Sequence, residues 1–197
     1  MAIPAFTIDG VLPPFLGPDP GGHLAHMSPH MATAAEVVDR FATTDGRRGI
    51  LFGWLEHRAA MRAIGIDRGF QWLDGSFLEA KEPNDLDLVT FVHPPGAPRP
   101  GPAIWRDLLR VNPHVFERST VKARFKLDSF FVQMDGTPET LVSMSRYWLQ
   151  LFSHQRRTLL WKGMLQVPLA DGAGDAAALA QLAAEAAPAP APAGDQP

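Results

Sequence analysis

Hydrophobic residues recur along this chain with two periods, and these periods predict both helices and strands. Helices are predicted where apolar residues return every three or four positions, at 33–42, 45–64, 103–111 and from 137 onward. Strands are predicted where shorter runs are apolar or alternate with polar residues, at 70–73, 85–92, 121–128 and 158–167. The chain is therefore expected to combine helices and strands in one folded unit.

The clearest alternation lies at 121–128. The apolar residues of this run, which are expected to face the core, are Val121, Ala123, Phe125 and Leu127. The charged residues, which are expected to share the opposite face, are Lys122, Arg124, Lys126 and Asp128. A solvated strand face can carry such charges without any function. Three cations beside one acid also suit a groove for a polyanion, with the acid directed at a metal ion, so both interpretations stay open.

Length and composition predict one domain with two appended segments. The chain has 197 residues, of which 46% are hydrophobic, so it can bury one core. Residues 1–31 are rich in Pro, Gly and His but also carry apolar side chains, so they are expected to form an arm packed on the domain. Residues 170–197 are mostly Ala, Pro and Gly and are expected to form a disordered tail. Residues 32–169 remain as the domain.

Charge and cysteine content exclude several classes of protein. The formal net charge is −3, and the tail carries four acids but no Lys or Arg. The rest of the chain is close to neutral, so a protein that coats DNA is not expected. The absence of cysteine excludes disulfides, thiolate zinc sites and a cysteine nucleophile. With no apolar run of membrane-spanning length and no secretory signal, a cytoplasmic protein without a membrane partner is expected.

Candidate chemistry lies between residues 73 and 89. Gly75-Ser76 forms a turn after an apolar run, and Asp85 and Asp87 flank Leu86. Because side chains alternate along a strand, the two aspartates point the same way and repel each other. A hard divalent cation such as Mg²⁺, or Mn²⁺ in its place, would remove that repulsion. Glycine lets the backbone approach a phosphate, and the serine can donate hydrogen bonds to phosphate oxygens, which suits metal-assisted nucleotidyl transfer.

Gly75-Ser76 followed by Asp85-Leu86-Asp87 resembles the signature of the nucleotidyltransferase superfamily, which has the polymerase-beta-like fold. Within it, the order of segments over roughly residues 3–167 is similar to that of a family of uncharacterised bacterial nucleotidyltransferase-like proteins. The matching segments include Ile3-Pro4, 10–14, 73–77, 81–87 and Lys162-Gly163.

This resemblance implies an α+β fold with a mixed nucleotidyltransferase-type sheet and helices mainly on the face away from the acids. It implies phosphate contacts at the glycine and serine of the turn. The carboxylates that would act in catalysis and as metal ligands are Asp85, Asp87 and Asp128. The cations expected to bind the nucleotide are Lys122, Arg124 and Lys126.

The leading expectation is metal-dependent nucleotidyl transfer from an NTP to an RNA end or a protein hydroxyl. The resemblance further implies a toxin–antitoxin or phage-defence setting, with a toxin or an antitoxin as partner. The alternative is a module of the same fold with weak or no catalysis, acting as an antitoxin or a scaffold. The loop between Ser76 and Asp85, which is a residue or two shorter than usual, favours this alternative. Nucleotide or metal sensing without turnover is a third possibility.

Overall fold

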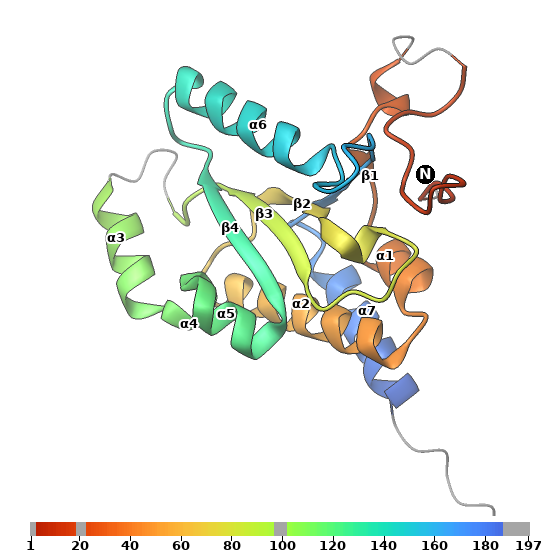
Figure 1. Ribbon diagram of the computed structural model, residues 1–197. Coiled ribbons are helices and arrows are strands. Elements are labelled where there is room, and N and C mark those ends of the chain that lie inside the picture. The colour runs from red at the N-terminus through yellow and green to blue at the C-terminus, as the bar shows by residue number, and fades with distance from the viewer. Residues whose placement is uncertain (1–2, 19–22, 97–101, 187–197) are drawn as a thin grey trace, which may run out of the picture.

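One mixed sheet of five strands organises the computed structural model, which describes residues 3–18, 23–96 and 102–186 (Figure 1). Across the sheet the order is β1-β5-β2-β3-β4. The strands are β1 (His30–Met31), β2 (Gly69–Asp74), β3 (Leu86–Val92), β4 (Leu127–Gln133) and β5 (Leu165–Pro168). β2 runs antiparallel to both of its neighbours, β3 and β5, whereas the β1–β5 and β3–β4 pairs are parallel. The expected α+β fold with a mixed sheet is confirmed.

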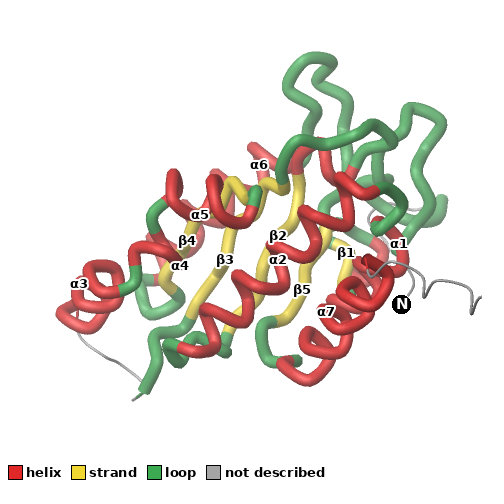
Figure 2. The backbone as a smooth tube through the Cα atoms, turned by 90° about the horizontal axis from the view of Figure 1, so that it is seen from below, coloured by secondary structure: helices red, strands yellow, loops and turns green. Residues whose placement is uncertain are grey.

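Helices cover the two faces of the sheet unequally (Figures 1 and 2). The helices on one face are α1 (Ala34–Phe41), α2 (Asp45–Ala63), α5 (Arg118–Phe125) and α7 (Gly172–Ala186). The opposite face carries α6 (Pro138–Phe152), and two helices lie beside β4, namely α3 (Pro102–Val111) and α4 (Pro113–Phe116). No helix among the described residues is both long and apolar enough to cross a membrane.

The strands feed two hydrophobic cores because their side chains alternate between the faces. Leu73 and Leu88 belong to the larger core, which lies against α1, α2, α5 and α7. Trp72 and Val89 belong to a second core, which packs on α6 through residues such as Trp148. The placement of most helices on one face is thereby confirmed.

Local capping signals explain where three of the helices begin. Thr33 and Glu36 form a capping box at the start of α1, and the Thr44 side chain accepts a hydrogen bond from the α2 backbone. Thr137 caps α6, and Pro138 occupies its first turn. Because these signals act within four residues, the helix starts at 34, 45 and 138 were predictable from sequence to within a residue.

The prediction of a strand at 121–128 is wrong. Residues 118–125 form α5, Lys126 ends this helix in the left-handed conformation (φ 57°), and β4 begins at Leu127. Val121 and Phe125 are both buried, and a spacing of four residues suits one face of a helix as well as one face of a strand. The charged residues at 122, 124, 126 and 128 therefore do not share a strand face.

The prediction of a disordered tail from residue 170 is wrong for residues 172–186. These residues form α7, which buries Ala178 and Leu182 in the larger core. The carboxylate of Asp175 lies 2.7 Å from Arg58 Nε, and both side chains are buried. Ala-rich sequence favours helix, and contacts with distant segments supply the stabilisation that composition does not show. Residues 187–197 lie outside the described part of the chain.

The expected last strand at 158–167 is much shorter than predicted. Only its end joins the sheet, as part of β5, whereas residues 153–162 form a loop closed by a β-bridge between His154 and Trp161. The described part of the N-terminal arm packs on the domain, where Val11 and Leu12 are buried. His30 is buried, and its Nε2 atom lies 2.8 Å from the carbonyl oxygen of Pro13.

Candidate functional site

Three aspartates form a row across adjacent strands on the α6 side of the sheet. Asp87 on β3 pairs in register with Asp74 on β2 and with Asp128 on β4. Neighbouring strands lie about 5 Å apart, and residues in register point to the same face. Because Leu86 and Leu88 enter the larger core, Asp87 between them points to the opposite face. Folding thus gathers carboxylates from three separate segments.

Gly75 forms a tight turn directly against this row. Its φ angle is +76°, and a Cβ atom at this position would lie 1.9 Å from Asp87 Oδ2. A side chain would therefore clash with the carboxylate, and a positive φ is itself unfavourable for other residues. Ser76 follows in a short 3-10 helix (Gly75–Leu78), so the turn and Asp87 are held in contact.

A cleft of about 700 Å³ opens beside the turn. One wall is acidic and contains Asp74, Glu79 and Asp87 together with Gly75 and Ser76. The other wall comes from the end of α6 and the loop that follows it. Its charged or titratable side chains are His154, Arg156 and Arg157. Two further cations of the lining, Lys162 and Lys81, form ion pairs with the acidic wall. Anionic phosphate groups fit the cationic wall, and cations fit the acidic wall.

Lys162 ties the acidic wall to the glycine turn. It is buried, and its Nζ atom lies 3.0 Å from Asp74 Oδ1, 3.5 Å from Glu79 Oε1 and 3.2 Å from the carbonyl oxygen of Gly75. Burial raises the pKa of Asp74 to about 7, against the opposing effect of Lys162. Asp74 Oδ1 receives no hydrogen bond of good geometry from the described residues, so the ion pair leaves part of its bonding capacity unused.

Charges of both signs act on Asp87: Asp85 and Asp128 disfavour its ionised form, whereas Arg156 and Lys162 favour it. Burial raises its pKa, and the nearby charges of Asp85 and Asp128 raise it further. Asp87 makes neither a hydrogen bond nor an ion pair with any described residue. A cation bound at this position would remove the repulsion among Asp85, Asp87 and Asp128.

Asp85 and Asp128 are each held by a cation from α5. Lys122 Nζ lies 2.7 Å from Asp85 Oδ2, and Arg118 reaches Asp128 through two nitrogens at 2.5 and 2.7 Å. The Arg118 hydrogen bonds lower the pKa of Asp128. Lys122 and Arg118 are 52% and 60% exposed, and Arg118 also lies over the Phe130 ring at 4.8 Å.

The predicted site residues thus separate into three groups. Gly75, Ser76 and Asp87 line the cleft. Asp85 and Asp128 lie next to Asp87 but outside the cleft lining, and Lys122 neutralises Asp85 instead of facing the cleft. The two remaining cations do not line the cleft either. Arg124 packs on the Phe125 ring at 4.8 Å, and Lys126 caps α5.

Sequence reasoning did not identify the cationic wall of the cleft. Lys162 entered the prediction only through the resemblance, and Arg156 and Arg157 did not enter it at all. A signal was present, because residues 140–170 contain Arg146, Arg156, Arg157 and Lys162 but no Asp or Glu. Asp74 was overlooked because it precedes the glycine turn rather than belonging to the Asp-x-Asp pair.

Carboxylate oxygens are the ligands that a hard cation prefers, but the carboxylates of this site are not arranged as a metal-binding group. Within residues 3–18, 23–96 and 102–186, no group of three or more His, Asp or Glu side chains is gathered closely enough to hold a metal ion. Binding of a metal ion by Asp85, Asp87 and Asp128 together would require Lys122 and Arg118 to move away from their partners.

The fold and the site define an α+β protein in which a row of carboxylates and a glycine turn border a cationic cleft. Residues 4–168 match DUF6932, a family of unknown function. Because this match covers most of the chain, the protein belongs to that family. No curated protein and no solved structure gives a significant match to the chain. The family match includes the site and ends before α7.

Proposed function

We propose that this protein transfers a nucleotidyl group from an NTP to an acceptor with the help of Mg²⁺ or Mn²⁺. The observation that carries the proposal is the position of Asp87, which lies in register between Asp74 and Asp128 and against the Gly75 turn. Carboxylates and a glycine turn next to a cationic wall are what metal-assisted transfer of phosphate groups requires. The resemblance to nucleotidyltransferases supports the same reaction.

Each group of residues has a role in this proposal. Asp85, Asp87 and Asp128 would hold the metal, which when bound stabilises charge that develops on phosphate oxygens. The backbone and hydroxyl of Ser76 would donate hydrogen bonds to the triphosphate. Arg156 and neighbouring cations of the loop would neutralise the remaining phosphate charge. Lys162 keeps the turn in place through the Gly75 carbonyl.

The ion pairs at the site support a second candidate, a binding module without turnover. Lys122 and Arg118 already neutralise Asp85 and Asp128. If these pairs stay closed, Asp87 is the one carboxylate of the three without a direct ion pair, which is too few ligands for a metal ion that activates an NTP. An antitoxin or a scaffold of this kind would bind its partner without consuming nucleotide.

An assay that follows transfer of a radioactive label from NTP to an acceptor distinguishes the enzyme from the binding module. The purified protein is incubated with each α-labelled NTP, Mg²⁺ or Mn²⁺, and cell extract as a source of acceptors. We expect label on a macromolecule, loss of labelling in Asp87→Asn, and full labelling in the matched control Asp107→Asn, whose side chain is exposed on α3. Absence of labelling from the parent with every NTP contradicts the enzyme and supports the binding module.

Metal binding gives a readout that does not depend on finding the acceptor. A metal at a hundredfold excess over its dissociation constant stabilises the folded state by about 2.7 kcal/mol. We expect Mn²⁺ to raise the melting temperature of the parent and of Asp107→Asn but not of Asp87→Asn. In EDTA, Asp87→Asn should be at least as stable as the parent, because it removes repulsion among the carboxylates.

A further inference from the structure

The segment from residue 140 to residue 170, which begins within α6, has basic side chains but no acidic ones. Residues 140–170 contain four Lys or Arg residues and no acid, although the whole chain has a net charge of −3. Lys162 is buried in the acidic wall, whereas Arg156 and Arg157 are exposed. Neither arginine makes a hydrogen bond or an ion pair with any described residue. Two guanidinium groups therefore remain available to an anionic partner.

Backbone hydrogen bonds hold this segment in a defined loop. The Lys162 amide donates to the Ser153 carbonyl at 2.9 Å, and the Gln155 amide donates to the Leu160 carbonyl at 2.9 Å. The β-bridge between His154 and Trp161 closes the loop at its base. Arg156 and Arg157 are thus presented by a built structure, so binding through them requires little ordering of the backbone.

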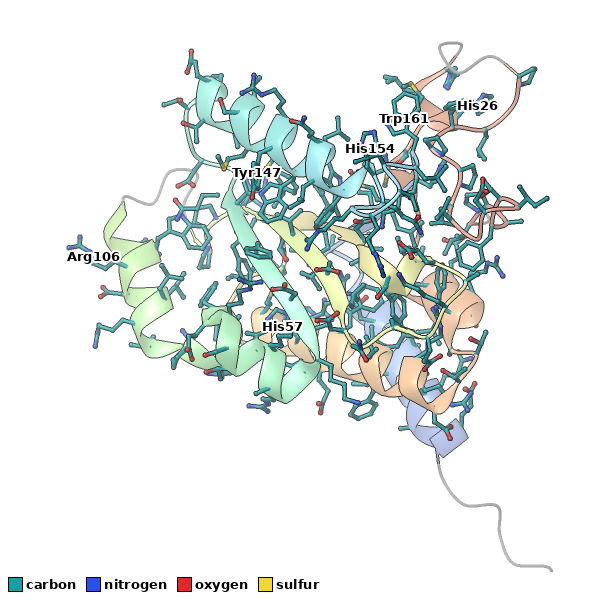
Figure 3. All side chains as sticks on the ribbon, in the orientation of Figure 1. His26, His57, Arg106, Tyr147, His154 and Trp161 are labelled. Carbon is teal, nitrogen blue, oxygen red and sulfur yellow. The ribbon has the colours of Figure 1, made fainter. Side chains whose placement is uncertain are left out.

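The base of the loop exposes an aromatic surface. The Trp161 and His154 rings are stacked with centroids 6.1 Å apart, and Trp161 is 57% exposed. All five tryptophans lie in the described residues, and the other four are at most 8% exposed. Tyr147, 55% exposed on the neighbouring helix α6, lies apart from Trp161 (Figure 3) but lines a hollow together with His154. Exposed flat rings beside arginines suit the faces of nucleobases.

His154 connects this aromatic surface to the acidic cleft. A hollow of about 510 Å³ is lined by Tyr147, Gln150, Leu151, His154, Arg156 and Leu159. Leu151, His154 and Arg156 also line the cleft that holds Asp87. Arg156 is close enough to act on both Asp87 and Asp128 electrostatically. A strand of nucleic acid lying along the loop would therefore end near the carboxylates.

We propose that the loop at 153–162 and Tyr147 bind single-stranded nucleic acid, with bases stacked on Trp161 and Tyr147 and phosphates paired with Arg156 and Arg157. This deepens the proposed function, on which it rests for one point, that the bound strand is the acceptor. A nucleic acid fits better than a protein because free guanidinium groups and aromatic rings occur together without any carboxylate from 140 to 170. A single strand is required because bases in a duplex have no free faces.

Binding is measured directly, in EDTA and without NTP, so that no catalysis is needed. Fluorescently labelled RNA and DNA strands of about 12 nucleotides, a length suited to one binding surface of this kind, are titrated with the full chain, alongside a duplex of the same sequence. We expect both single strands to bind more tightly than the duplex. The ratio of the RNA affinity to the DNA affinity then shows which of the two nucleic acids the protein prefers. No saturable binding of either strand at about 50 mM salt, where such contacts are strong, overturns the inference.

Variants test the two kinds of contact separately. Trp161→Ala should weaken binding about tenfold, which corresponds to about 1.4 kcal/mol. Trp161→Phe should retain most of the affinity, because it keeps an aromatic ring, and so distinguishes lost stacking from a folding defect. Arg156→Ala with Arg157→Ala should lower the slope of log affinity against log salt by about 1.4, since each phosphate contact on a single strand contributes about 0.7. Full affinity in Trp161→Ala contradicts stacking on this residue.

The matched control removes two exposed arginines elsewhere, by Arg106→Ala with Arg110→Ala on α3, where Arg106 lies far from the loop (Figure 3). If this control loses as much salt dependence, the contacts with phosphate are not specific to Arg156 and Arg157, and the proposed location of the binding site is wrong. A second test measures quenching of Trp161 fluorescence by acrylamide without nucleic acid. If the quenching decreases as the protein concentration rises, the surface is a contact between copies of the chain and the inference is overturned. Strand binding by the parent without labelling refutes the enzyme alone, and labelling without strand binding refutes this inference alone.

Discussion

Replacing Asp175 with Ala tests whether buried charge holds α7 to the rest of the fold. The Asp175 carboxylate lies 2.7 and 3.0 Å from two nitrogens of Arg58 and 2.5 Å from Arg62 Nη2. Arg58 is 0% exposed and Asp175 is 2% exposed. Burial lowers the pKa of Arg58 even with this carboxylate present. The variant would leave a guanidinium group in the core without its buried counter-charge.

The expected loss of stability follows from this geometry. Removing one partner of a buried ion pair costs about 3–5 kcal/mol. Arg58 keeps hydrogen bonds to Gln71 Oε1 at 2.9 Å and to the Pro168 carbonyl at 2.6 Å, but both acceptors are neutral. In a chain of this size each kcal/mol lowers the melting temperature by about 2–4 °C, so a decrease of roughly 6–20 °C is expected.

Thermal and urea unfolding of the full chain measure the effect. Glu185→Ala is the matched control, because Glu185 lies exposed near the end of the same helix, and it should change stability by less than about 0.5 kcal/mol. Truncation after Ala170 should lower the melting temperature at least as much as Asp175→Ala. If Asp175→Ala melts within about 2 °C of the parent, α7 is not anchored by this ion pair and the reasoning fails.

Three further outcomes are expected. Gly75→Ala should abolish labelling and lower stability by about 1–2 kcal/mol from the positive φ alone, with a further loss because its Cβ would meet Asp87 Oδ2; unchanged melting and labelling would contradict the packed turn. Lys162→Met should cost about 3–5 kcal/mol in urea unfolding, because Asp74 loses its buried partner; a loss below 1 kcal/mol would show that this pair is not structural. Burial raises the pKa of Asp74 from 3.8 to about 7 and lowers that of His57 from 6.5 to about 4. The folded state therefore holds an extra proton at Asp74 and lacks one at His57, so rising pH across this interval destabilises through Asp74 and stabilises through His57. From about pH 4 to about pH 7, stability should rise more steeply with pH in Asp74→Asn than in the parent, and less steeply in His57→Gln than in the parent; parallel profiles for both variants would refute the assignment.

Features that depend on neighbouring residues could be predicted from the sequence. Thr33, Thr44 and Thr137 each cap a helix within their own first turn, so the three helix starts are encoded locally. The strand pair around the glycine turn was also predictable, because Gly75 and the Asp85–Asp87 pair lie within a single short segment. These local signals are enough to indicate an α+β domain and to place Asp87 and the turn in one site.

Features that depend on distant contacts were decided by the tertiary structure. The spacing of Val121 and Phe125 suits a strand and a helix equally, and packing against α2 selects the helix. The tail folds as α7 because Asp175 meets Arg58, a residue 117 positions earlier in the chain. Lys162 likewise joins the site from 87 positions beyond Gly75. A buried charge is stable only where its partner is placed beside it, and that placement arises when the sheet and its helices assemble.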